Sequence, residues 1–159
     1  MKNDILDVLV YLLENHYFDQ HNQLIKNKNA IENELLNNGF NYSDIERTFS
    51  WFYKLQATMV SMSYTPFQSS APRIYHPSES FKIHPRARKL LYRLEQEGAI
   101  DASTREVVID QAMALEDPIV FVHQIKWIIF FVLLHQKGNA EDLSWIQEYI
   151  ISDYTCIAN

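Results

Sequence analysis

One stretch, LLNNGFNYSDIERTFSWF (residues 35–52), decides the fold of this chain because it has the pattern of two helices separated by a glycine turn. Apolar residues recur at helical intervals on both sides of Gly39, and glycine readily adopts the positive φ at which many helices end. Ser43 and Glu46 have the spacing of a capping box, so we expect the second helix to begin at Ser43 and to continue to about Met62. The stretch therefore predicts a capped helical hairpin.

The same pattern occurs in helix-turn-helix units that read DNA. The second helix of such a unit presents basic or amide side chains at its start. Here that helix starts with Ser43, Asp44, Ile45 and Glu46, and the first basic residue is Arg47. Because carboxylates facing phosphates repel them, we interpret the stretch as a structural hairpin rather than a DNA-recognition unit.

Helical spacing of apolar residues continues through most of the chain, and no segment has the alternation of a convincing strand. We expect helices near residues 3–16, 30–39, 43–62, 85–98, 101–115, 120–136 and 139–150. The most apolar run, WIIFFVLL (residues 127–134), is far shorter than the roughly 20 residues that cross a bilayer, so it is interpreted as a buried central helix. The prediction is an all-α fold with about seven helices.

A segment rich in proline and serine, residues 63–80, is the best candidate for a boundary between two helical halves. We expect an N-terminal three-helix unit over residues 1–62, a linker over 63–80 and a C-terminal helical unit over 81–159, built round the apolar helix 120–136. Within and just after the linker, RIYHPSESF (residues 73–81) has two interpretations. It either docks against the helical halves or exposes a binding edge, since arginine and tyrosine are common interface anchors.

Charge is unevenly distributed along the chain. The formal net charge of −6 argues against a general polyanion binder, which needs surplus lysine and arginine. Between Arg73 and Arg93, however, six basic residues stand against one acid and give a net charge of +5. This window is either a solvated helix face balanced by acids elsewhere, or a contact for an anionic partner such as RNA, DNA or an acidic protein face. The candidate contact residues are Arg73, Lys82, Arg86, Lys89 and Arg93.

Patterns typical of catalysis, cofactor binding or metal binding are missing from the sequence. There is no G-x-S-x-G, P-loop or G-x-G-x-x-G motif, and His16 and His21 are five residues apart, which does not suit a zinc-binding helix. The single cysteine, Cys156, cannot form an intrachain disulfide and is consistent with a reducing cytoplasm. We therefore expect no enzyme activity, no cofactor, no metal and no membrane partner.

Five segments together resemble the bacterial Smg family, a domain of unknown function. They are DILDVLVYLLENHY, GFNYSDIERTFSWFYKL, RIYHPSES, LLYRLEQEGAIDASTREVVIDQAMAL and IKWIIFFVLL, which begin at residues 4, 39, 73, 90 and 125. The resemblance rests on their order and spacing and covers nearly the whole chain. It implies a soluble, cytoplasmic bacterial protein that is helical throughout, and it implies neither an activity nor functional residues.

Three functional hypotheses follow. The first is a non-enzymatic adaptor or regulator that binds another cytoplasmic protein, with Trp51, Tyr53 and Tyr75 as candidate interface residues. The second is an accessory factor that makes a weak nucleic-acid contact through the basic window, residues 73–93. The third is an enzyme whose site the sequence does not reveal.

Overall fold

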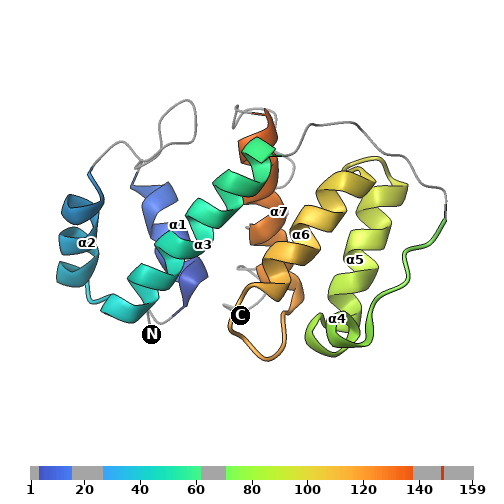
Figure 1. Cartoon of the computed structure of the whole chain (residues 1–159), viewed down its shortest axis with the longest axis horizontal. Helices are drawn as coiled ribbons and strands as arrows, with labels where there is room; N and C mark the ends of the chain where they lie inside the picture. The colour runs from blue at the N-terminus through green and yellow to red at the C-terminus, as the bar shows by residue number, and fades with distance from the viewer. Residues whose placement is uncertain (1–3, 16–26, 62–70, 138–147, 149–159) are drawn as a thin grey trace. The chain divides into compact units, whose positions relative to one another are not determined.

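Every regular element in the described part of the chain is a helix (Figure 1). The computed structural model describes residues 4–15, 27–61, 71–137 and 148. These ranges contain α1 (Ile5–Glu14), α2 (Lys28–Asn37), α3 (Tyr42–Ser61), α4 (Pro77–Lys82), α5 (Pro85–Gln96), α6 (Ala102–Met113) and α7 (Val122–Lys137). The predicted all-α class is confirmed. The last predicted helix, residues 139–150, lies outside the described residues apart from Glu148.

The chain divides into two compact units, Met1–Val60 and Ser61–Asn159. The first residues of the predicted linker, 63–70, lie outside the described part of the chain. Its last residues, 77–80, belong to helix α4 and are therefore not an unstructured connection.

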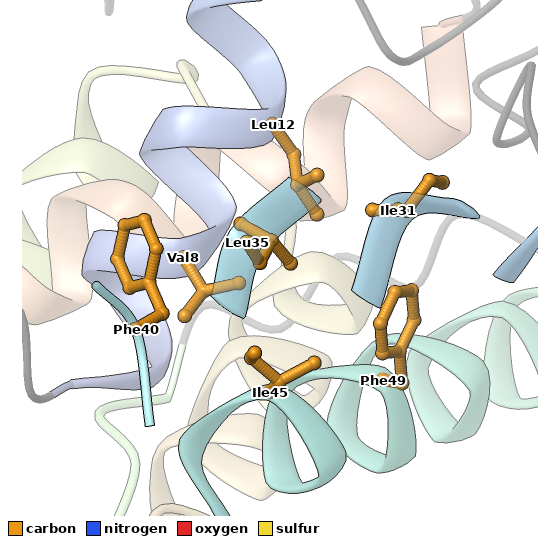
Figure 2. Packing of buried hydrophobic residues seen from close by; sticks show 7 residues of the cluster. All are labelled: Val8, Leu12, Ile31, Leu35, Phe40, Ile45 and Phe49. Atoms are coloured by element: carbon orange, nitrogen blue, oxygen red, sulfur yellow. The ribbon is translucent and has the colours of Figure 1, made fainter. Parts of the chain in front are cut away.

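The core of the N-terminal unit is formed where its three helices meet (Figure 2). Each helix contributes apolar side chains at helical spacing, and the turn after α2 adds one more; together they are Val8, Leu12, Ile31, Leu35, Phe40, Ile45 and Phe49. Gly39 has a φ of +88°, which glycine adopts without the steric cost that a Cβ adds, and it turns the chain directly into this core. The predicted glycine turn between two helices is therefore confirmed.

The predicted capping box at the start of α3 is wrong. Helix α3 begins at Tyr42, so Ser43 already lies in its first turn and cannot be the capping residue. The side-chain amide of Asn41 instead donates to the Asp44 carboxylate at 3.3 Å, and Glu46 pairs with Lys28 of helix α2 at 3.2 Å. The polar residues were suitable for capping, but the helix starts one residue earlier than the pattern indicated.

Helix α7 contains a long unbroken buried run within the C-terminal unit. Every side chain from Ile128 to Leu134 is buried, as the apolar run predicted. No helix in the described ranges is both long enough and apolar enough to cross a bilayer.

Short polar caps fix where the helices of this unit begin. His76 and Glu79 form a capping box at α4, in which the His76 ring accepts from the Ser78 amide and Glu79 accepts from the His76 amide. His84 caps α5, whose first residue is Pro85, and the Asp101 carboxylate accepts from the Thr104 amide at 2.7 Å to cap α6.

An isolated β-bridge joins two segments that are far apart in the sequence. Ile83 and Val120 pair in parallel, with the Val120 amide donating to Lys82 at 2.8 Å and the His84 amide donating to Val120 at 3.0 Å. Because Val120 uses its backbone groups in this bridge, helix α7 begins at Val122, two residues after the approximate start that the sequence predicts.

Candidate interaction surface

Two of the candidate interface residues lie on helix α3, and they differ in how far their side chains are exposed. Trp51 is only 3% exposed, so its assignment to an interface is wrong. Tyr53 is exposed, and its ring stacks on buried Phe49 with the ring centres 6.2 Å apart. Of these two residues, only Tyr53 is accessible to a partner.

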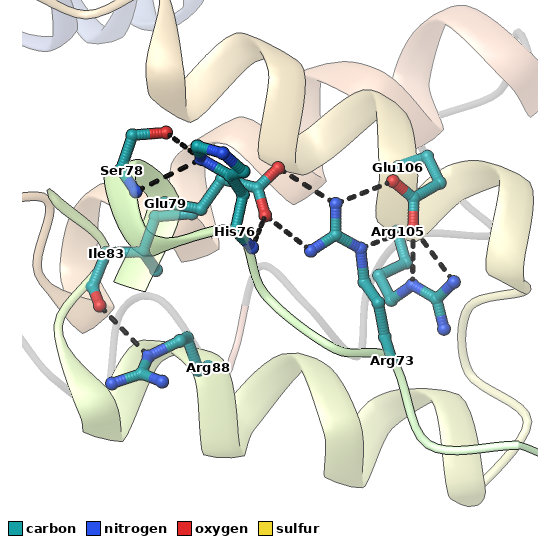
Figure 3. A network of polar contacts seen from close by, with 8 residues as sticks. All are labelled: Arg73, His76, Ser78, Glu79, Ile83, Arg88, Arg105 and Glu106. Atoms are coloured by element: carbon teal, nitrogen blue, oxygen red, sulfur yellow. Dashed lines mark hydrogen bonds and ion pairs between the residues drawn. The ribbon is translucent and has the colours of Figure 1, made fainter. Parts of the chain in front are cut away.

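A cluster of charged side chains fastens the segment before helix α4 to helix α6 (Figure 3). Arg73 donates to both carboxylate oxygens of Glu79, at 2.7 and 2.9 Å, and to both of Glu106, at 2.7 and 3.0 Å. Arg105 donates to Glu106 at 2.9 Å and to Glu95 of helix α5 at 2.6 Å. We call these five residues the Arg73 cluster. It links three helices to the segment that contains Arg73.

The third candidate interface residue, Tyr75, is half-buried beside this cluster. Two guanidinium groups lie over its ring, with Arg73 at 4.7 Å and Arg88 at 5.5 Å from the ring centre. Burial raises the pKa of the Tyr75 hydroxyl. These contacts dock Tyr75 within the C-terminal unit, whereas Ile74 and Phe81 of the same RIYHPSESF segment are exposed.

The Arg73 cluster shifts the pKa values of its own members. Hydrogen bonds with Glu79 and then Glu106 raise the pKa of the Arg73 guanidinium. The hydrogen bond from Arg73 lowers the pKa of Glu79. Burial acts to raise the pKa of Glu106, but hydrogen bonds from Arg73 and Arg105 outweigh burial and lower it. All three groups are therefore held in their charged forms.

These shifts predict that the chain loses stability in acid. A carboxyl whose pKa is lowered on folding contributes its full stabilisation when the pH is above its pKa in the unfolded chain, which is 4.5 for Glu79. This stabilisation is lost as the pH falls through the lower pKa of the folded chain. Replacing Glu79 with glutamine removes one titrating group, so the variant should be less stable at neutral pH and lose less stability on acidification. Urea unfolding at neutral pH and at about pH 3.5 measures the difference; an equally steep acid loss in both proteins would contradict this role.

The structure divides the five candidate anion contacts into two groups. Arg73 and Lys82 are used internally: Arg73 forms the cluster, and the Lys82 ammonium donates to the Leu115 carbonyl and, at 2.9 Å, to the Met113 carbonyl where helix α6 ends. Arg86, Lys89 and Arg93 are exposed on helix α5, and Arg93 lies 3.8 Å from Glu97. Only the three residues on α5 are placed to meet an anionic partner.

Exposed apolar side chains surround the Ile83–Val120 bridge. Ile83 and Val120 are themselves fully buried, whereas Phe81 is 87% exposed and Ile119 and Phe121 are each exposed by more than a third of their area. The Phe121 ring lies 5.3 Å from the His84 ring and 6.4 Å from the His123 ring, measured between centres. We call Phe81, His84, Ile119, Phe121 and His123 the bridge surface.

Sequence analysis did not find the bridge surface. The sequence predicts that the apolar helix begins at residue 120, so Val120 and Phe121 were expected to pack inward, and Ile119 was assigned to no element. A local signal was nevertheless present, because Gln124 follows Phe121 by three residues and its side-chain oxygen accepts from the Phe121 amide at 2.8 Å. This contact satisfies a free amide at a helix start and places Phe121 just before helix α7.

No group of three metal-binding side chains occurs within the part of the chain that the structure describes. The two histidines that the sequence analysis considered, His16 and His21, lie outside it.

Comparison with known proteins identifies the family. The family model described as "Protein of unknown function (DUF494)" matches residues 5–157. Curated relatives named "Protein Smg homolog" from Stenotrophomonas maltophilia and Xanthomonas oryzae pv. oryzae are each 35% identical over 153 residues, which is 96% of this chain and 96% of theirs. No solved structure matches the chain. A family model that spans almost the whole chain, together with full-length relatives, shows that this protein belongs to the bacterial Smg family (DUF494).

Proposed function

We propose that this chain is a non-enzymatic adaptor or regulator that binds another protein of the bacterial cytoplasm, and that it does so through the bridge surface. The observation that carries the proposal is the combination of exposed rings with a fixed backbone. Phe81 and Phe121 are exposed within two residues of a bridge whose own side chains are fully buried. Exposed aromatic residues are enriched in the centres of protein interfaces.

Several contacts hold the backbone beneath these side chains. The two hydrogen bonds of the bridge join residues 82–84 to Val120, and the Lys82 ammonium ties the end of α4 to the end of α6. The Gln124 side chain fixes the Phe121 amide. A surface that is already ordered loses less conformational entropy on binding, so its apolar area contributes more of its transfer free energy to affinity.

A second candidate function, a nucleic-acid accessory factor, rests on the exposed basic residues of α5. Two of the five residues first considered for that contact, Arg73 and Lys82, are engaged inside the protein. The remaining three would release few counterions, which supports only weak, salt-sensitive binding to nucleic acid. The bridge surface therefore supports protein binding better.

The test is affinity capture from a lysate of the source bacterium, with and without nuclease, followed by mass spectrometry. We expect the wild-type chain to retain a stoichiometric protein in both conditions and the Phe81→Ser variant to lose it. Because Phe81 is exposed, the variant should fold normally, which circular dichroism can check. Val60→Ser is the matched control: Val60 is also exposed but lies in the other unit, so this variant should retain the partner. Capture of nucleic acid alone would refute the proposal.

A further inference from the structure

Helix α5 has one buried face and one basic face. Its apolar residues Ala87, Leu90, Leu91 and Leu94 are buried. Arg86, Lys89 and Arg93 follow one another at steps of three and four residues, so they share a different face of the helix, and all three are exposed. We call these three residues the α5 basic face.

Two cations of this face, Arg86 and Lys89, differ from three arginines of the same unit that are held by internal contacts. Arg73 and Arg105 belong to the Arg73 cluster, and Arg88 donates to the Ile83 carbonyl at 3.2 Å while its guanidinium lies over Tyr75. Those contacts explain Arg73, Arg88 and Arg105 as parts of the fold. Within the described residues, the side chains of Arg86 and Lys89 make no hydrogen bond or ion pair, so the fold itself gives no reason for their charge.

The α5 basic face continues directly into the bridge surface. His84 caps helix α5 by accepting from the Arg86 amide at 3.2 Å, and the His84 ring also contacts the Phe121 ring. An exposed apolar ring and two exposed cations thus lie at the same end of one helix. A partner that covers Phe121 also comes within reach of Arg86.

We propose that the α5 basic face, together with the adjoining Phe121, binds an acidic segment of a partner protein. This inference rests on the proposed function and names the chemistry of the partner: carboxylates opposite Arg86 and Lys89, and an apolar side chain against Phe121. Complementary charge at the edge of an interface speeds association and selects the partner, while the apolar contact supplies most of the affinity.

An acidic protein segment fits this surface better than a nucleic acid does. The chain carries a net charge of −6, so it repels a long polyanion outside the immediate area of the basic face. Exposed Glu97 lies one turn beyond Arg93, at the end of α5, where a phosphate backbone following the helix would meet it. A protein segment presents a few carboxylates at defined positions and need not extend as far as Glu97.

The experiment uses the full chain as bait in lysate with and without nuclease treatment, with a zero-length carbodiimide cross-linker that joins a lysine amine to a carboxylate. We expect mass spectrometry to find Lys89 linked to an aspartate or glutamate of the captured protein. The Arg86→Glu, Lys89→Glu double variant should retain about tenfold less of that protein. Lys89→Arg keeps the charge but has no amine, so it should retain the protein and lose the cross-link.

Lys54→Glu is the control for charge reversal away from the α5 basic face, because Lys54 is an exposed lysine of the N-terminal unit; it makes one charge reversal, whereas the double variant makes two. It should retain the partner. Equal capture by the wild type and the double variant would overturn the acidic-segment inference while leaving the proposed function standing. Capture of no protein would overturn both. Capture that nuclease abolishes would replace the acidic protein with a nucleic acid.

Discussion

Replacing Leu35 with alanine should lower the free energy of unfolding by about 3 kcal/mol, among the largest effects expected for one substitution in this chain. Leu35 has no exposed area and lies in the middle of the cluster that joins helices α1, α2 and α3 (Figure 2). Truncation removes buried methyl groups and leaves a cavity that the surrounding helices only partly close. The lost burial of methyl groups and the cavity both destabilise the N-terminal unit.

Leu36 provides the control on the same helix. It is the next residue of α2 but is 42% exposed, so Leu36→Ala should cost less than about 1 kcal/mol. Leucine is exchanged for alanine in adjacent helical positions in both variants, so differences in helix propensity cancel and the comparison isolates burial. Urea unfolding followed by circular dichroism measures both values. Equal losses would mean that α2 does not pack through its Leu35 face.

The core around Leu35 could be predicted from the sequence because helical periodicity is a local property. The limits of that reasoning appear at Trp51, whose burial was missed. Trp51 follows Thr48 by three residues and Asp44 by seven, which places all three along one side of helix α3. Asp44 and Thr48 are buried despite being polar, because Asp44 pairs with Arg47 and the Thr48 hydroxyl donates to the Asp44 carbonyl. Because these polar side chains are buried with their hydrogen bonds satisfied, the pattern of apolar residues alone underestimates the width of the buried face of helix α3.

The charged residues could be located from the sequence, but their partners could not. Counting charges between residues 73 and 93 gave an excess of positive charge, yet Arg73 is neutralised partly by Glu106, which lies 33 residues away in the chain. The bridge between Ile83 and Val120 is similarly distant in sequence. Such contacts depend on how helices pack, and nothing in the local pattern specifies them. Sequence reasoning therefore found the basic window and could not say which of its residues were already engaged.

Replacing Arg73 with alanine should destabilise the C-terminal unit by about 2 kcal/mol. The substitution removes a guanidinium that donates to two carboxylates and leaves Glu79 and Glu106 close to each other without that shared cation. Breaking a fully buried ion pair costs roughly 3–5 kcal/mol, and breaking an exposed one costs roughly 0–1 kcal/mol. The Arg73 and Glu79 side chains are mostly buried but Glu106 is more accessible, so a value between these ranges is expected.

Arg93→Ala is the control for this effect. Arg93 also pairs with a glutamate in the same unit, Glu97, but both side chains are well exposed and the charged atoms are 3.8 Å apart. Its replacement should cost less than about 0.5 kcal/mol. Urea unfolding at neutral pH measures both variants, and similar losses for Arg73→Ala and Arg93→Ala would contradict the structural role of the Arg73 cluster.

Arg73→Lys separates the contribution of charge from that of geometry. Lysine keeps the positive charge, but its single ammonium cannot reach both oxygens of two carboxylates at once, nor does it present a planar guanidinium to the Tyr75 ring. If charge alone fastens this segment, Arg73→Lys should be nearly as stable as the wild type. The four hydrogen bonds of Arg73 favour the opposite result, a loss closer to that of Arg73→Ala, because a planar donor group held between Glu79 and Glu106 is what joins the segment to helix α6.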